Sequence, residues 1–137
     1  MGGDEAVSAS SPLVAGVGFR RATGADEIAA LVRRALAEAG RESLLCLATA
    51  ADRAEDAAFT AAARALGVPG RGVEAEALAA ADAGCLTHSA RVESLRGVGS
   101  LAEAAALAVA GPGARLLGPR SASAGATCAL AKPAEVP

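Results

Sequence analysis

Residues 14–27 restrict the fold more than any other part of the sequence, because a strand pattern there runs directly into a helix start. An apolar segment at residues 14–19 leads into Arg20 and Arg21. Thr23 is then predicted to cap a helix, since apolar residues recur behind it at helical spacing. A turn of this kind collects backbone N–H groups, the positive end of a helix and two guanidinium groups. It therefore suits a negatively charged ligand.

The alternation of strand and helix patterns continues along the chain. Asp52 with Glu55, and Ser100 with Glu103, have the spacing of helix capping boxes, and Gly67 is typical of a helix end. Strands are predicted at residues 14–19, 43–49, 71–76, 114–118 and 126–131, and helices at residues 23–39, 52–66, 76–83, 89–96 and 100–110.

This order of elements predicts an α/β fold with three layers, α/β/α. Its sheet is expected to be mainly parallel, with about five strands and an antiparallel strand at one edge. With 137 residues, 53% of them hydrophobic, the chain is long enough for one core. Residues 13–131 are predicted to form this single domain, between a disordered tail at residues 1–12 and a frayed tail at residues 132–137.

Composition excludes several classes of partner. The net charge of -2 gives no attraction to nucleic acid, and with no Trp or Tyr there is no stacking platform for single strands. The start of the chain lacks a secretory signal, and the longest apolar run, at residues 104–110, is too short to cross a bilayer. We therefore expect a cytoplasmic protein that binds neither nucleic acid nor membrane.

Three cysteines, Cys46, Cys85 and Cys128, form no close pair and are predicted to be buried, reduced thiols. Cys85 and His88 have a Cys-x-x-His spacing that would supply half of a zinc site, but no second ligand pair follows. Neither a metal nor a cofactor is expected. His88 is the one side chain with an ordinary pKa near neutrality, and without a carboxylate pair the sequence by itself specifies no reaction.

Ligands of parallel sheets bind beyond the carboxyl ends of the strands. The turn at Arg20 and Arg21 and the turn at residues 51–53 are predicted to lie at this rim. If the strand at residues 114–118 is parallel to the first two, the polar loop at residues 119–125 joins them. Four arginines would then face one crevice, namely Arg20, Arg21, Arg53 and Arg120.

Each of these motifs also has a simpler interpretation. Arg20 and Arg21 either clamp a carboxylate or phosphate, or are solvated and balance Asp26 and Glu27. The loop at residues 119–125 suits anion contact or a flexible lid, although surface turns often have the same composition. Asp52, Ser100 and Glu103 are fully explained as helix caps.

The glycines of the first strand offer a further alternative. Gly16 and Gly18 match the first two glycines of a dinucleotide-binding fingerprint. Arg21 occupies the third glycine position, however, and no clear acidic partner for a ribose ends the second strand. The match is weak, and a nucleotide-binding domain is a distant alternative.

Six segments carry a family resemblance, at residues 16–23 (GVGFRRAT), 47–49 (LAT), 66–69 (LGVP), 97–107 (GVGSLAEAAAL) and 119–120 (PR), and at residues 126–131 (ATCALA). In this order they resemble the family of CobE proteins and CbiG C-terminal domains, which belongs to cobalamin (corrin ring) biosynthesis. CbiG-type proteins open a lactone on a cobalt-containing precursor and release a two-carbon fragment, but they carry additional N-terminal domains. A chain of this length therefore resembles the stand-alone members of the family.

The resemblance implies a protein that binds a corrin or precorrin intermediate, rich in carboxylates, and assists a pathway step, with other cobalamin-pathway enzymes as further partners. The alternative is a hydrolase or lyase that acts on a precorrin lactone or two-carbon fragment, assisted by Thr23, His88 or Glu103. The predicted ligand-binding residues are Gly18, Arg20, Arg21, Thr23, Arg53, Gly99, Ser100, Arg120, Ser121, Ser123 and Thr127.

Overall fold

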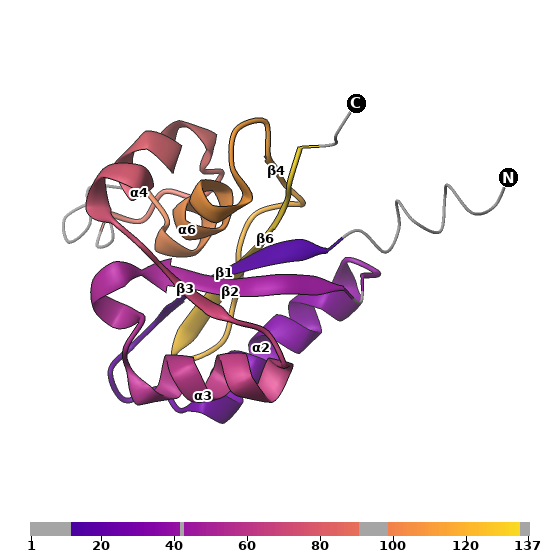
Figure 1. The fold of residues 1–137 in the computed structure, drawn as a ribbon, viewed down its shortest axis with the longest axis vertical. Coiled ribbons are helices and arrows are strands. Elements are labelled where there is room, and N and C mark those ends of the chain that lie inside the picture. The colour runs from indigo at the N-terminus through magenta and orange to yellow at the C-terminus, as the bar shows by residue number, and fades with distance from the viewer. Residues whose placement is uncertain (1–11, 42, 91–98, 135–137) are drawn as a thin grey trace, which may run out of the picture.

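The computed structural model describes residues 12–41, 43–90 and 99–134, and arranges them in three layers (Figure 1). A central sheet lies between helices α2 and α3 on one face and helices α4 and α6 on the other. In chain order the elements are β1 (Leu13–Phe19), α2 (Ala25–Glu38), β2 (Leu44–Ala50), the 3₁₀ turn η1 (Ala51–Arg53), α3 (Ala57–Leu66), β3 (Gly70–Val73), α4 (Ala75–Ala81), the 3₁₀ turn η2 (Asp82–Gly84), α6 (Leu101–Ala110), β4 (Arg115–Leu116), β5 (Ser121–Ala122) and β6 (Ala126–Lys132).

The sheet has the strand order β3-β2-β1-β6-β4, and β5 also pairs with β6. Strands β1, β2 and β3 are parallel, whereas β6 is antiparallel to β1, β4 and β5. The predicted three-layer α/β fold is confirmed. The antiparallel strand is not at an edge, however, because β6 pairs along the free side of β1 and the short β4 covers its other side. Residues 121–122, expected within a loop, form β5, which brings the sheet to six strands.

The face of the sheet under α6 is packed through alanines and glycines. A Cβ atom at Gly16 would lie 2.0 Å from the Ala102 carbonyl oxygen and 2.6 Å from the Ala106 nitrogen. The backbone of α6 therefore lies directly on β1, which only a glycine at this position allows. Gly16 serves helix packing here, which gives the weak fingerprint match a structural explanation.

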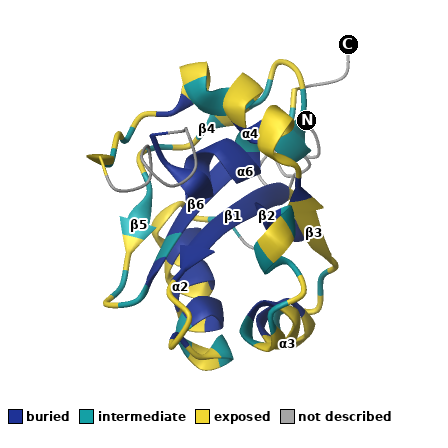
Figure 2. Ribbon diagram, turned by 90° about the vertical axis from the view of Figure 1, so that its left-hand side faces the viewer, coloured by how far each residue is buried: buried dark blue, intermediate teal, exposed yellow. Residues whose placement is uncertain are grey.

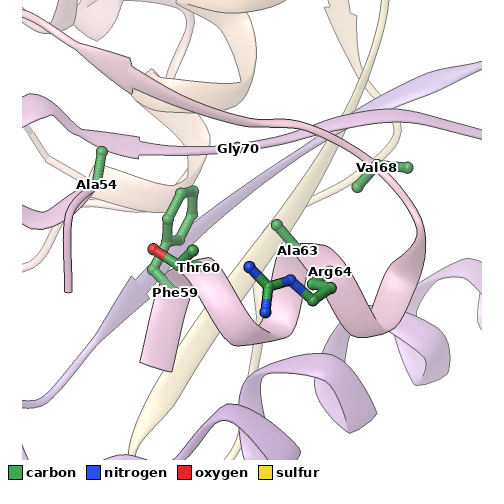
Figure 3. A pocket seen from close by; sticks show the side chains of 7 residues that line it. All are labelled: Ala54, Phe59, Thr60, Ala63, Arg64, Val68 and Gly70. Carbon is green, nitrogen blue, oxygen red and sulfur yellow. The ribbon is translucent and has the colours of Figure 1, made fainter. Parts of the chain in front are cut away.

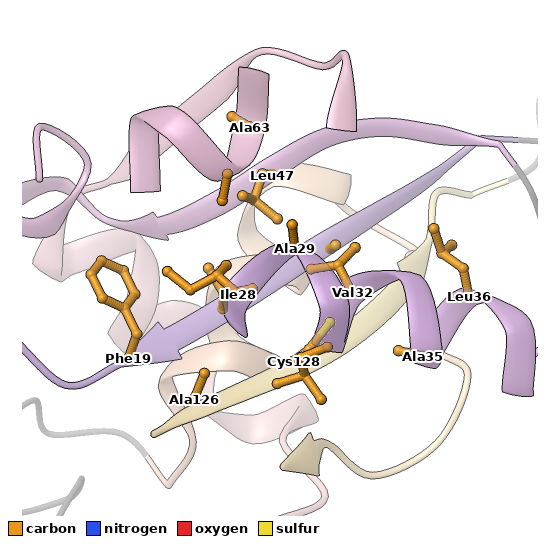
Figure 4. Packing of buried hydrophobic residues seen from close by; sticks show 14 of the residues in the cluster. Phe19, Ile28, Ala29, Val32, Ala35, Leu36, Leu47, Ala63, Ala126 and Cys128 are labelled. Carbon is orange, nitrogen blue, oxygen red and sulfur yellow. The ribbon is translucent and has the colours of Figure 1, made fainter. Parts of the chain in front are cut away.

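The opposite face carries the larger side chains (Figure 4). Ile28 and Val32 of α2 are fully buried against the sheet. The Phe19 and Phe59 rings stack with their centroids 6.2 Å apart. Figure 2 shows the consequence, since β1 and most of β6 are buried between the two helix layers.

Two predicted helix starts are shifted along the chain. The N-cap of α2 is Gly24 rather than Thr23, whose hydroxyl donates a hydrogen bond elsewhere. The N-cap of α3 is Asp56 rather than Asp52, because residues 51–53 form η1 first. Ser100 does cap α6, and Gly67 ends α3 with a positive φ of 73°. The helix predicted at residues 89–96 lies almost wholly outside the described residues.

All three cysteines are free and buried, as predicted. Burial raises the pKa of Cys85 to about 11 and that of Cys128 to about 12. Within residues 12–41, 43–90 and 99–134, no helix is both long enough and apolar enough to span a membrane.

Candidate functional site

The basic turn at the end of β1 is fastened to the turn that precedes β6. The Arg20 backbone N–H donates to the Gly125 carbonyl over 3.0 Å, and the Thr23 hydroxyl donates to the same oxygen over 2.7 Å. The Thr23 N–H closes the turn onto the Arg20 carbonyl at 3.0 Å. Thr23 is buried, whereas Arg20 and Arg21 are exposed. The turn thus has a fixed backbone and presents two guanidinium groups to solvent.

Glu27 holds the turn before β6 in place from the first turn of α2. Its carboxylate accepts hydrogen bonds from the Ser123 hydroxyl and, at 2.6 Å, from the Gly125 N–H. These two bonds, the Ser123 bond most, lower the pKa of Glu27 below 4.5. Glu27 is therefore engaged with backbone and hydroxyl donors, and the hydroxyl of Ser123 is part of this link.

The link predicts a pH dependence of stability. Because the pKa of Glu27 is lower in the folded than in the unfolded protein, its stabilising contribution is present above 4.5 and is lost as pH falls through the folded pKa. Glu27→Gln should reduce the free energy of unfolding near neutral pH, and this difference from wild type should shrink in acid. Urea unfolding from pH 7 to pH 3 measures it. Glu38→Gln, at an exposed position of the same helix, is the control. A difference that stays constant with pH would contradict the assignment.

Glu103, in the first turn of α6, holds two loops on the face of the sheet that α6 covers. Its side chain is completely buried. One carboxyl oxygen accepts from the N–H groups of Leu86 and Thr87, both at 2.7 Å, and the other from the Thr87 hydroxyl at 2.8 Å and the Arg120 N–H at 2.9 Å. Both oxygens thus act as hydrogen-bond acceptors. This one side chain sets the position of two loops, including the backbone of Arg120.

The start of α6 is held in a similar way by η2. The Gly99 N–H donates to Asp82 Oδ1 at 2.7 Å, and the Gly99 carbonyl accepts from the Ser89 N–H at 2.8 Å. His88 is exposed, and its Nδ1 lies so near Gly99 that a Cβ there would approach it to 2.2 Å. A Cβ at this position would also lie 2.9 Å from the Thr87 carbonyl oxygen, a backbone atom that side-chain rotation cannot move. Among the described residues, no three His, Cys, Asp or Glu side chains are grouped to hold a metal ion.

Arg53 joins the carboxyl ends of β1 and β2. Its Nε donates to Asp56 at 2.7 Å, its Nη1 donates to the Phe19 carbonyl at 2.9 Å, and its guanidinium lies 4.2 Å from the centre of the Phe19 ring. Its buried Nη2 makes no hydrogen bond to any described residue. Most of the Arg53 side chain is thus engaged in the fold itself.

Between these fastened loops lies the end of the β1–β6 pair. Gly18 and Thr127 are partners in this ladder, and Thr127 Oγ1 would lie 2.9 Å from a Cβ at position 18. Ser121 lies apart from them. It pairs with Cys128 and lines a cavity of about 170 Å³ against the C-terminal half of α2.

Apart from Arg53 and Ser121, the structure divides the predicted site residues into two groups on either side of Gly18 and Thr127. Hydrogen bonds through Gly125 and Glu27 join Arg20, Thr23 and Ser123 in the first group, with Arg21 in the same turn. The hydrogen bonds of Glu103 and of the start of α6 define the second group. The first comprises Arg20, Arg21, Thr23 and Ser123, and the second Gly99, Ser100, His88, Glu103 and Arg120. The sequence analysis missed Asp82 and Thr87, which have no recognisable spacing to their partners. It considered Glu27 only as a negative charge that balances Arg20 and Arg21.

A larger cavity, of about 410 Å³, lies between α3 and β3 (Figure 3). It is lined by Ala54, Phe59, Thr60, Ala63, Arg64, Val68 and Gly70. None of the residues predicted to bind a ligand takes part in it.

The chain is thus a three-layer α/β domain whose loops carry arginines at the carboxyl end of β1, the central strand of its sheet. Comparison with known proteins gives the family. Residues 13–131 match the model for the C-terminal region of cobalamin synthesis protein G, and the chain belongs to this family of cobalamin biosynthesis proteins.

Individual relatives agree with this assignment. The chain is 39% identical over 132 residues to Protein CobE of Sinorhizobium sp., with 95% of this chain and 86% of that protein covered. The crystal structure of CobE, a protein from the cobalamin (vitamin B12) biosynthetic pathway, superimposes with a TM-score of 0.83 at 35% identity, covering 89% of this chain and 90% of that one. The cobalamin biosynthesis protein chiG from Agrobacterium tumefaciens gives a TM-score of 0.74 at 37% identity, over 90% and 99% of the two chains.

Proposed function

We propose that this domain binds a corrin or precorrin intermediate through the ligand's peripheral carboxylates and so assists a step of cobalamin biosynthesis. The observation that carries the proposal is the pair of exposed arginines, Arg20 and Arg21, on a turn whose backbone is held at both ends. Corrin precursors carry several acetate and propionate groups, and a preformed basic turn binds such groups without first having to become ordered.

The hydrogen bonds of Glu27 and Glu103, the two acidic residues that hold these loops, support this proposal. Glu27 accepts from Ser123 and Gly125, and Glu103 accepts from backbone and hydroxyl groups. Arg53 with Asp56 is the one ion pair seen among the described residues. Neither carboxylate thus forms an ion pair with Arg20 or Arg21, and both guanidinium groups can contact an anionic ligand.

The candidates for acid or base catalysis favour binding over turnover. The Thr23 hydroxyl already donates to Gly125, and the four acceptor positions of Glu103 are occupied. A general base must be able to accept the proton that it abstracts. For Thr23 and Glu103 this favours a binding role over the hydrolase or lyase alternative. His88, the third candidate in that alternative, is exposed and is tested by the product analysis below.

An anaerobic absorbance titration with a series of precorrin and corrinoid intermediates tests the proposal. We expect the double replacement Arg20→Ala with Arg21→Ala to raise the Kd about tenfold or more, since each lost hydrogen bond between charged groups contributes about 1.5–3 kcal/mol. Arg115→Ala is the matched control, because Arg115 is exposed in β4 at the opposite end of the sheet. Equal affinity of the double variant and the control would contradict the site.

Mass analysis of the recovered pigment separates the two functions. Unchanged mass after binding, with and without other pathway enzymes, is the expected result for a protein that binds and delivers an intermediate. A product of changed mass, formed by the purified protein alone, would replace this proposal by the hydrolase or lyase alternative.

A further inference from the structure

Strand β3 forms one edge of the sheet and pairs with β2 alone among the described strands. The Pro69 carbonyl points toward β2, since it accepts from the Leu47 N–H at 3.0 Å. Backbone groups alternate along a strand, so those of Gly70 and Gly72 point away from β2. Gly70 and Gly72 are exposed. An edge of this kind is a template for another strand.

The edge continues beyond β3 to Glu74. This residue is exposed, and its φ of -69° and ψ of 156° keep the backbone extended. Its carbonyl already accepts from the Leu78 N–H at 3.0 Å, so that the N–H group is what Glu74 offers to a further strand. By the same alternation, this N–H points outward like that of Gly72.

The cavity between α3 and β3 lies directly beside this edge (Figure 3). Gly70 belongs to both, and a Cβ there would lie 2.7 Å from the Phe59 ring. Phe59 and Ala63 supply an apolar floor, whereas Arg64, which is exposed, is the one charged residue of the lining. The cavity therefore suits a carboxylate on a short apolar stem, entering from the position opposite Gly70.

We propose that two copies of this chain associate by antiparallel pairing of their β3 strands about a two-fold axis at Gly72. In this register Glu74 of each copy stands opposite Gly70 of the other. Residues opposite each other in an antiparallel pair share a face of the sheet, so the Glu74 side chain enters the cavity of the other copy and its carboxylate meets Arg64. The interface is isologous, and each contact occurs twice.

Two registers whose axis lies nearer the start of β3 are disfavoured. An axis at residue 71 places the two Arg71 side chains directly opposite each other, where like charges are destabilising. An axis at residue 70 needs the Val68 N–H, which already donates to the Ala63 carbonyl at 3.0 Å. The axis at Gly72 uses backbone groups that β2 leaves unpaired and brings opposite charges together.

Sedimentation velocity of the full chain over a range of micromolar concentrations tests this dimer. Wild type should show a concentration-dependent monomer–dimer equilibrium. Glu74→Arg and Arg64→Glu should each raise the dimer Kd about tenfold or more, because each places two pairs of like charges in the interface. The combination of both substitutions restores opposite charges and should return the Kd to near the wild-type value.

Glu76→Arg is the control, because it makes the same change of charge at an exposed position of α4 outside the β3 edge. Both substituted residues are exposed, so circular dichroism should show intact folding. A wild type that remains monomeric overturns the proposal. So does a Glu74→Arg protein that matches Glu76→Arg, or a double variant that is no tighter than the single ones. Corrinoid titration is independent of all these outcomes.

Discussion

Gly16→Ala is expected to lower the free energy of unfolding by about 3 kcal/mol or more. The added methyl group would lie 2.0 Å from the Ala102 carbonyl oxygen and 2.6 Å from the Ala106 nitrogen. Both atoms belong to the backbone of α6, so no side-chain rotation relieves the overlap and the whole helix must move. Because α6 also packs against β2 and β6, its movement would disturb contacts across this face of the sheet.

Urea or thermal unfolding checks this expectation. Gly118→Ala is the control, since a Cβ at position 118 would meet nothing within 4 Å. An alanine that fits restricts the unfolded chain and is stabilising by about 0.4–1 kcal/mol. The two replacements should therefore change stability in opposite directions. A Gly16→Ala protein as stable as Gly118→Ala would show that α6 does not lie so close to β1.

Replacement of Glu103 should have an effect of similar size. Glu103→Ala removes the acceptor of three backbone N–H groups and one hydroxyl in a fully buried place, and we expect a loss of about 3–5 kcal/mol. Glu103→Gln keeps the size of the side chain but points an amide NH₂ at part of the same donors. Its loss should be smaller, about 1–3 kcal/mol.

A larger loss of unfolding free energy in Glu103→Ala than in Glu103→Gln, with both below wild type, distinguishes a hydrogen-bonding role of Glu103 from simple packing. Denaturant unfolding of both variants, with Glu38→Ala as an exposed control, measures it. Since Glu103 also positions the Arg120 backbone, Glu103→Gln should also weaken the proposed binding of a corrinoid where the protein remains folded. Full stability of Glu103→Gln would mean that this carboxyl group only fills space.

Most helices and strands could be predicted because they depend on local sequence patterns, namely the spacing of hydrophobic residues and glycines at helix ends. The strands and helices up to Val73 follow from hydrophobic spacing, and the ends of α3 and α6 follow from glycine at the terminal positions. The place of β6 could not be predicted in this way. Its position between β1 and β4 depends on which side of β1 is free, and no local pattern in the sequence encodes this.

The candidate site was predictable as a place but not as a set of contacts. The turn at Arg20 and Arg21 does lie at the carboxyl end of β1. Thr23 looked like a helix cap, yet its hydroxyl bonds to Gly125, 102 residues away. Glu103 likewise has the spacing of a capping box, and the Ser100 hydroxyl accepts from its N–H at 3.3 Å, but its carboxylate bonds to residues 16 or 17 positions distant. Such partners come together only through the tertiary fold.

The close contact of α6 with Gly16 also bears on how this domain can diverge in sequence. Under α6 there is no room for a larger residue on β1, so that helix keeps its position while surface residues change. The α3 side, with about 410 Å³ of open space beside β3, leaves room for small shifts of its helix. Homologous domains should therefore superimpose most closely at β1 and α6 and differ most in the placement of α3, so that new contacts arise on one side of the sheet while the other preserves the shape of the rim.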